Sequence, residues 1–259
     1  MKEWLNSITE MTRQTIWKGK NRFDSFAPIR NNCYCKFLVD GRDYFWAISE
    51  ALTMAQDCIF IHDWWLSPEL YMRRPAQGNE EYRMDRILKE RASQGVKIFI
   101  VVYRNVGATV GTDSSWTKHR LLHLHPNIHV IRSPNQWLQN TYFWAHHEKI
   151  AVIDYTIAFI GGIDLCYGRY DTPEHVLRDD DESLVKQIFP GKDYSNARIN
   201  DFYDLDKPFE DMYDRKTVPR MPWHDVHMMT IGEVARDLSR HFVQRWNYLL
   251  RQKRPSRPT

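Results

Sequence analysis

The 259-residue sequence contains little cysteine and little glycine. Its four cysteines, Cys33, Cys35, Cys58 and Cys166, include no C-x-x-C pair. This spacing is typical of neither a zinc site nor a disulfide framework, so a reducing intracellular environment is expected. Only 11 residues are glycine, which excludes collagen-like proteins and glycine-rich linkers.

Long apolar runs and a strong charge excess are also missing. No stretch reaches the roughly 18 uncharged apolar residues that a membrane-spanning helix needs. The first residues, MKEWLNSITEMTRQ, lack the apolar core of a signal peptide. We therefore expect a cytoplasmic protein that meets a membrane only from its surface. Lys and Arg (36) barely exceed Asp and Glu (33), so the charge does not indicate a nucleic-acid partner.

The residues that are present indicate a globular α/β protein. Apolar residues make up 42% of the chain and charged residues 27%. Short β-branched runs alternate with segments of helical periodicity. The pattern predicts strands at 36–39, 58–63, 97–103 and 128–133, and helices at 43–56, 80–94 and 113–124. This alternation predicts helices packed on a largely parallel sheet.

The pattern changes after residue 148. Two apolar runs, Lys149–Asp154 and Ile157–Gly162, are separated by two residues and predict a hairpin. The polar stretch from Leu165 to about Pro222 is too long for an ordinary connection and indicates a functional or covering segment. Ile231–Leu250 is predicted to be a long amphipathic helix. The organisation expected is an N-terminal segment (1–34), one lobe (35–250) and a basic flexible tail (251–259).

One motif indicates chemistry. His147, Lys149 and Asp154 form the pattern H-x-K-x-x-x-x-D, and Gly161 and Gly162 follow. Composition alone predicts about 0.045 chance matches to the three-residue pattern, and roughly 10⁻⁴ once both glycines are required. Chance alone therefore does not explain the complete motif.

The spacing of the motif suits a phosphodiester. On a strand, His147 and Lys149 project to the same face. The imidazole can attack phosphorus or move a proton near neutral pH, and the ammonium can neutralise a phosphate oxygen, without a metal. Gly161 and Gly162 would let the backbone approach a phosphate closely. His146 points to the opposite face and is expected to be structural.

Two acidic residues have open roles at this stage. Asp154 has the opposite parity to His147 and lies at the strand end. It either begins the hairpin turn or orients a histidine through a hydrogen bond. Asp164 either organises the phosphate site or is a turn residue.

The stretch His147–Asp164 resembles the first HKD motif of the eukaryotic phospholipase D family. Segments 61–69, 168–171, 205–209 and 220–225 also resemble that family, so the similarity covers roughly residues 30–250. The resemblance implies a phospholipase D-type α/β/α sandwich lobe with a mixed sheet flanked by helices. It implies hydrolysis of phosphatidylcholine to phosphatidic acid and choline through a phospho-histidine, with His147, Lys149 and Asp154 as catalytic residues.

The resemblance also suggests substrate-binding residues. Trp64, beside Trp65, is expected to stack on the choline ammonium, although core packing would explain at least one of the two. Gly161, Gly162 and Asp164 are expected to border the phosphate. His224 is expected at the entrance of the site, with a structural role in a loop as the alternative.

The sequence departs from the family in having a single HKD motif, since none of the other ten histidines has Lys two residues on. In the family two motifs meet at one site, so a second HKD lobe or a homodimer is the expected partner, beside a phospholipid substrate. No cofactor is expected, although the resemblance allows phosphoinositide activation. The alternatives are a catalytically inactive half-domain that binds lipid or a partner, and a dimeric phosphodiesterase acting on another phosphodiester.

Overall fold

The computed structural model describes residues 2–15, 21–104, 114–134, 145–181, 186–194 and 204–253. The chain divides into two units, 1–33 and 34–259. The first unit holds helix α1 (Lys2–Gln14) and a 3-10 turn, η1 (Arg22–Asp24). The predicted N-terminal segment, 1–34, ends one residue beyond this division. Residues 254–259 of the predicted tail lie outside the described residues.

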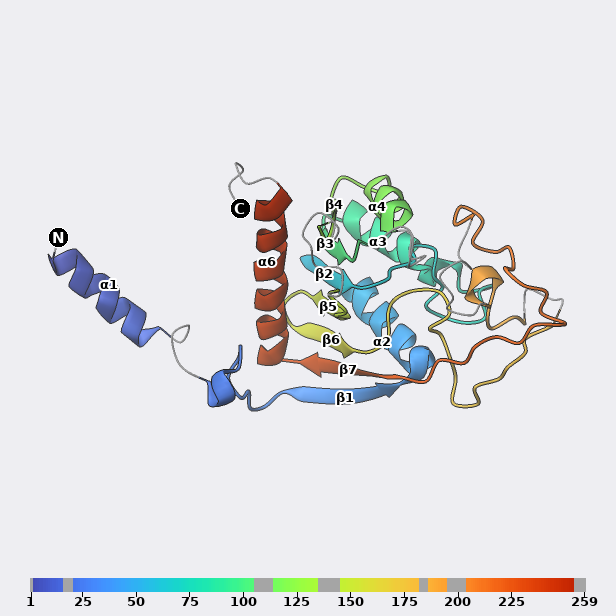
Figure 1. Ribbon diagram of the computed structural model, residues 1–259, viewed down its shortest axis with the longest axis horizontal. Coiled ribbons are helices and arrows are strands. Elements are labelled where there is room, and N and C mark those ends of the chain that lie inside the picture. Colours follow the sequence, from blue (N-terminus) through green and yellow to red (C-terminus); the bar gives the residue numbers. More distant parts are fainter. Residues whose placement is uncertain are drawn as a thin grey trace. The chain divides into compact units, whose positions relative to one another are not determined.

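The second unit is built on a seven-stranded mixed sheet (Figure 1). The strand order is β1-β7-β6-β5-β2-β3-β4. The strands are β1 (Tyr34–Val39), β2 (Cys58–Asp63), β3 (Lys97–Val102), β4 (Ile128–Arg132), β5 (Ile150–Ile153), β6 (Ile157–Gly161) and β7 (Val226–Ile231). β2 pairs in parallel with β3, and β3 with β4, whereas the other four pairs are antiparallel.

The expectation of a largely parallel sheet is therefore wrong for one half of the sheet. β1 does not join the parallel strands that follow it, but pairs with β7 at the far edge. The predicted hairpin is confirmed, since β5 and β6 pair antiparallel around Asp154–Thr156. This hairpin and β7 make the sheet mixed, as the family resemblance implies.

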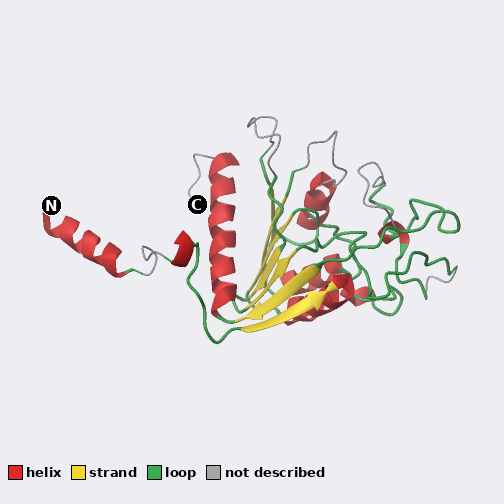
Figure 2. Cartoon of the chain, turned by 60° about the horizontal axis from the view of Figure 1, so that its bottom comes forward, coloured by secondary structure: helices red, strands yellow, loops and turns green. Residues whose placement is uncertain are grey.

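Helices cover both faces of the sheet, which confirms the α/β/α layering. Figure 2 shows the strands between α6 (Glu233–Lys253) on one side and the other helices of this unit on the other. Those helices are α2 (Asp40–Met54), α3 (Met84–Ser93) and α4 (Ser114–Leu122). Two short 3-10 turns, η2 (Glu80–Tyr82) before α3 and η3 (Gly191–Asp193) before β7, lie in the connecting segments. None of the described helices is both long and apolar enough to cross a membrane.

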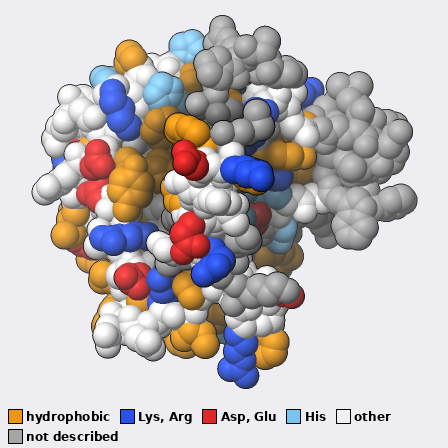
Figure 3. Space-filling model, turned by 90° about the vertical axis from the view of Figure 1, so that its left-hand side faces the viewer, with side chains coloured by type: hydrophobic (Ala, Val, Ile, Leu, Met, Phe, Trp, Pro, Cys, Tyr) orange, Lys and Arg blue, Asp and Glu red, His pale blue; other side chains and the backbone are white. Residues whose placement is uncertain are grey.

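The surface carries both signs of charge. On the face shown in Figure 3, Lys and Arg side chains are intermixed with Asp, Glu and apolar side chains. This distribution agrees with the small net charge of +3. Among the side chains coloured on that face, the Lys and Arg residues do not form the continuous basic stripe typical of nucleic-acid-binding proteins.

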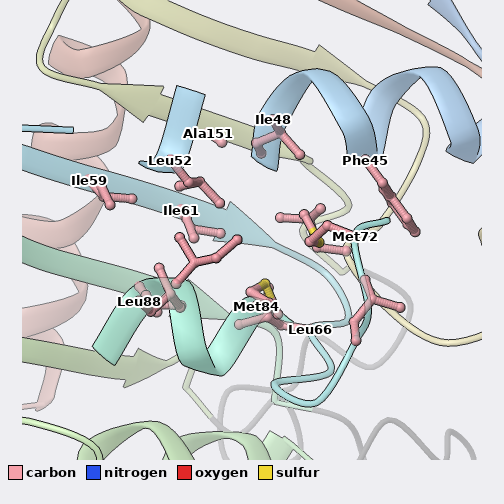
Figure 4. Close-up of a cluster of buried hydrophobic side chains, with 14 of the residues drawn as sticks. Phe45, Ile48, Leu52, Ile59, Ile61, Leu66, Met72, Met84, Leu88 and Ala151 are labelled. Atoms are coloured by element: carbon pink, nitrogen blue, oxygen red, sulfur yellow. The ribbon is translucent and has the colours of Figure 1, made fainter. Parts of the chain in front are cut away.

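Two apolar cores lie on the two faces of the sheet. In the larger one, Ile48 and Leu52 of α2 and Leu88 of α3 pack over Ile59 and Ile61 of β2 (Figure 4). In the smaller one, side chains of α6 pack on the opposite face, where Phe242 stacks on Phe60 with ring centroids 4.8 Å apart. β2 is buried along its whole length because both faces are covered.

The sequence-based expectation did not include β7. It assigned residues up to about 222 to a covering segment and began the last helix at Ile231, where the structure has a strand ending at Ile231 and a helix from Glu233. β7 contains buried His227 and Thr230, so its pattern is not one of uniformly apolar alternation. Its position places Asp225 and His227 beside the end of β6.

Candidate active site

Lys149 lies immediately before β5 and is almost completely buried. Its Nζ is 2.9 Å from Oδ1 of Asp164, and it donates a hydrogen bond of 3.2 Å to the backbone oxygen of His147. Trp64 covers it, with the ring centroid 5.5 Å from Nζ. A buried ammonium needs such partners, because its desolvation is otherwise very costly. Lys149 thus lies beside His147, as predicted, and contacts its backbone oxygen while pairing with Asp164.

His147 is exposed and lies beside Trp64, with ring centroids 5.1 Å apart. Partial burial and the positive charge of Lys149 lower its pKa, while the negative charge of Asp164 acts in the opposite direction. The imidazole is therefore neutral near pH 7. A neutral, accessible imidazole next to a fixed positive charge is equipped to attack an anionic phosphodiester.

Asp164 connects the charges below His147. It is buried, pairs with Lys149, lies 3.6 Å from Nε of Arg169 and accepts the Trp65 N–H at 3.2 Å. It is thus part of a buried network and not an isolated turn residue. The sequence left both roles open, and the structure places Asp164 beside Lys149 of the motif.

Asp63, at the end of β2, belongs to the same network although the sequence analysis did not select it. Its carboxylate accepts the N–H groups of Trp64 and Leu165, each at 2.9 Å. Burial raises its pKa well above the usual value, and the charge of Asp164 and a hydrogen bond to it raise it further. Asp63 and Asp164 thus share a buried network with the cations Lys149 and Arg169.

Asp154 lies at the opposite end of β5 from His147. Its carboxylate accepts the backbone N–H groups of Gln56, Asp57 and Cys58, at 2.8, 2.9 and 2.9 Å. Its φ of 49° is in the left-handed region, as the start of the tight β5–β6 turn requires. The turn alternative fits this geometry. The expectation that Asp154 orients a histidine as a catalytic residue stays a prediction; the contacts described here are those that fix the start of β2.

Gly161 and Gly162 lie against β7. A Cβ on Gly161 would come within 2.6 Å of the Cα and Nδ1 of His227, and one on Gly162 would overlap the carboxylate of Asp225. The lack of a Cβ therefore permits a close approach to β7 and to Asp225 before it, and the predicted contact with a phosphate stays a prediction. These glycines bring Asp225 near the site, where its charge acts on His147.

Trp64 and His224, the two side chains predicted to contact the ligand, lie in different surroundings. Trp64 is half-buried and contacts the motif, lying near His147, Lys149 and Tyr103, whereas Trp65 is buried in the core. The side chain of His224 is 67% exposed and its Nδ1 lies 2.7 Å from Oδ1 of the buried Asp40. His224 precedes Asp225, but its own contacts are with Asp40 and His175.

A second cluster lies on the other face of the sheet. His146 packs on His62, with ring centroids 4.5 Å apart, and burial, together with the neighbouring His62, lowers its pKa to about 3. Partial burial would raise the pKa of Glu148, but hydrogen bonds from His241 and His62 lower it below its usual range. His241 of α6 lies 2.5 Å from Glu148. The expectation that His146 points away from His147 agrees with this geometry, and the cluster anchors the motif to α6.

Comparisons with known proteins place this site in a family. A family model described as phospholipase D matches residues 51–254. The chain is 74% identical over 259 residues to Phospholipase D1 of Saccharomyces cerevisiae and 54% identical over 264 residues to Phospholipase D1 of Schizosaccharomyces pombe. It is 42% identical over 263 residues to Phospholipase D zeta 2 of Arabidopsis thaliana.

These matches cover all of this chain but only 15%, 19% and 24% of the three relatives. Among solved structures, NucT from Helicobacter pylori aligns over 84% of this chain and 98% of its own, with a TM-score of 0.47 and 13% identity. The family model and the motif residues His147 and Lys149 lead to the same conclusion: the chain belongs to the phospholipase D family.

Proposed function

We propose that this chain is the first HKD lobe of a phospholipase D that hydrolyses phosphatidylcholine to phosphatidic acid and choline. The single observation that carries the proposal is the exposed His147 imidazole above the buried pair of Lys149 and Asp164. The sequence relatives of this lobe bear the name phospholipase D. The lobe is proposed to span residues 35–250.

The proposed reaction needs two imidazoles. A ring nitrogen of neutral His147 attacks the phosphorus, and the bond from phosphorus to the choline oxygen breaks. A second, protonated imidazole gives its proton to the leaving choline oxygen and then removes a proton from water. That water attacks the phospho-histidine and releases phosphatidic acid and free His147. The lowered pKa of His147 favours the nucleophile role.

Within this scheme, Lys149 neutralises charge that develops on the non-bridging oxygens. Its buried pairing with Asp164 holds the ammonium in place, so that no side chain must reorganise during the reaction. Trp64 borders His147 and Lys149 and offers an aromatic face to the choline ammonium.

The second imidazole must come from another HKD motif, since this sequence contains one. We propose that it belongs to a second HKD lobe, either in a longer polypeptide or in a second copy of this chain. The protein then binds peripherally to the cytoplasmic side of a membrane, where its phospholipid substrate lies. The intermixed charges of Figure 3 and the net charge of +3 favour a lipid over a nucleic acid as the phosphodiester.

The test is choline release from phosphatidylcholine vesicles by the chain alone and by the chain mixed with a lobe that carries a second HKD motif. His147→Ala is the inactive control, and His119→Gln, at an exposed position of α4, is the matched control. We expect release in the mixture, or by the chain alone as a dimer, and none with His147→Ala. Silence of both samples from folded protein would contradict the proposal and favour a catalytically inactive lipid-binding or interaction module.

A further inference from the structure

Three side chains that are distant in sequence converge at the N-terminus of α2. Asp40, the first residue of α2, is 1% exposed. Its Oδ1 lies 2.7 Å from Nδ1 of His224, and its Oδ2 lies 3.6 Å from Nε2 of His175. One ligand atom from each residue lies within 4.8 Å of the others. The two separations bracket the roughly 3.3 Å between two ligands of a tetrahedral zinc ion.

The surroundings of Asp40 are unusual for a buried carboxylate. In the described part of the chain, its ion-pair partners are the imidazoles of His175 and His224, and neither Lys nor Arg pairs with it. Its φ of 63° lies in the left-handed region, which non-glycine residues seldom adopt. Such backbone positions cluster at ligand sites, where the surrounding structure holds them.

A second carboxylate lies behind His175. The His175 Nδ1 lies 3.2 Å from Oδ2 of Asp171, a carboxylate with no exposed surface, without a hydrogen bond between them. Asp171 is itself held by Arg220 at 2.9 Å and by the backbone N–H of Trp223 at 2.7 Å. A small rotation of the imidazole that places an Nδ1 proton on Asp171 would leave Nε2 available to an ion beside Asp40. Carboxylate, imidazole and metal are arranged in this way in many zinc sites.

We propose that Asp40, His175 and His224 bind a zinc ion, with water as the fourth ligand. Two imidazoles and one carboxylate suit zinc, whereas calcium and magnesium prefer oxygen ligands. The exposed His224 gives the ion access from solvent. The bound ion joins the loop at 172–177 and the residues before β7 to the start of α2. It thereby fixes Asp225, the residue after His224, beside Gly162.

A second group of possible ligands, His62, Glu148 and His241, is a less suitable zinc site. There one carboxylate oxygen, Oε2 of Glu148, lies near both imidazoles, at 3.3 and 2.5 Å. The positive charge of Arg245 acts on His241 and on the neighbouring His146. It opposes the binding of a further cation. The test must nevertheless separate the two groups.

The experiment measures zinc bound per chain. The full chain, made without a polyhistidine tag and stripped with a chelator, is dialysed against zinc and analysed by elemental mass spectrometry. We expect one zinc per chain, and at least about tenfold weaker binding for His175→Gln and for Asp40→Asn. His119→Gln and His241→Gln are the controls and should bind like the unmodified chain. Circular dichroism checks that each variant is folded.

Thermal unfolding gives an independent readout. Zinc should raise the Tm of the unmodified chain and of His241→Gln, and at the same zinc concentration should raise the Tm of His175→Gln by less, because stabilisation of the folded state falls as binding weakens. The proposal is overturned if the unmodified chain binds no zinc. It is also overturned if His175→Gln and Asp40→Asn bind as well as the unmodified chain, or if His241→Gln abolishes binding and His175→Gln does not.

Discussion

The two ends of β5 carry one sequence motif but differ in what their side chains contact. At the first end, Lys149 pairs with the side chain of Asp164 and His147 faces solvent. At the other end, Asp154 binds three backbone N–H groups and no titratable side chain of the first end. A motif that reads as one catalytic unit is therefore divided in space into a reacting end and a supporting end.

Substitutions at the two ends of β5 should therefore have different effects in experiments. Changes at His147 should alter turnover and leave stability nearly unchanged, because the side chain is exposed. Changes at Asp154 should alter stability and leave the turnover of folded molecules unchanged. Changes at Lys149 should alter both turnover and stability, since this side chain is both buried and close to the imidazole of His147.

The largest effect is expected for His147→Ala in the active pairing with a second HKD lobe. Loss of the attacking imidazole removes the covalent route, so choline release should fall by at least about 10³-fold, or roughly 4 kcal/mol in the activation barrier. The urea unfolding midpoint should stay close to that of the unmodified chain. Substantial remaining activity would show that another group attacks the phosphorus.

Lys149→Met should destabilise the fold as well as abolish activity. The substitution leaves the buried carboxylate of Asp164 without its main counter-ion, which typically costs about 3–5 kcal/mol in the free energy of unfolding. The double variant Lys149→Met with Asp164→Asn should recover part of that stability but no activity. If the double variant were as unstable as the single one, the ion pair would not be the cause.

Asp154→Asn should act on stability alone. Asparagine tolerates the left-handed backbone but carries no charge, so hydrogen bonds from three N–H groups are weakened, at a cost of roughly 2 kcal/mol. Choline release per folded molecule should match that of the unmodified pair. A large fall in kcat with unchanged stability would mean that Asp154 does act on the reacting histidine.

The last prediction concerns the pH dependence of stability and the buried His227 of β7, and its size is similar to that expected for Asp154→Asn. Burial lowers the pKa of His227 to about 3 from the usual 6.5. The unfolded chain therefore takes up a proton that the folded chain does not. The contribution of the neutral, buried His227 to the free energy of unfolding is complete above about pH 6.5 and is lost as the pH falls toward 3. At pH 5 this one residue should reduce the unfolding free energy by about 2 kcal/mol.

Urea unfolding at pH 7 and pH 5 measures this effect. His227→Gln removes the titrating group and should reduce the loss between the two pH values, even if its stability at pH 7 is lower. His119→Gln, an exposed histidine of α4, should leave the loss unchanged. An identical pH dependence in the unmodified chain and in His227→Gln would contradict the assignment.

Local patterns predicted much of the fold. The β-branched runs indicated β2, β3 and β4, and the two-residue spacing indicated the β5–β6 hairpin. β7 was not predicted, because its buried positions include His227 and Thr230, and a mostly polar segment precedes it. The pairing of β1 with β7 depends on contacts nearly 200 residues apart, which no local pattern contains.

The candidate site was predicted only in part for the same reason. The separation of His146 from His147 was predicted from strand alternation, but that premise is not met, because residues 145–149 precede β5, which begins at Ile150. The pairing of Lys149 with Asp164 and the involvement of Asp63 depend on how β2, β5 and the chain after β6 meet in space. The signal for Asp63 was an acidic residue ending a buried strand, which without tertiary contacts is equally typical of a turn.

The most direct test of the division of the motif compares His147→Ala with Asp154→Asn in one assay. Choline release from phosphatidylcholine vesicles is measured in the presence of the second HKD lobe and is normalised to the folded fraction of each variant. We predict no release above background for His147→Ala and the full rate for Asp154→Asn. Equal losses of activity in both variants would contradict the account, because they would make the two ends of β5 one catalytic unit.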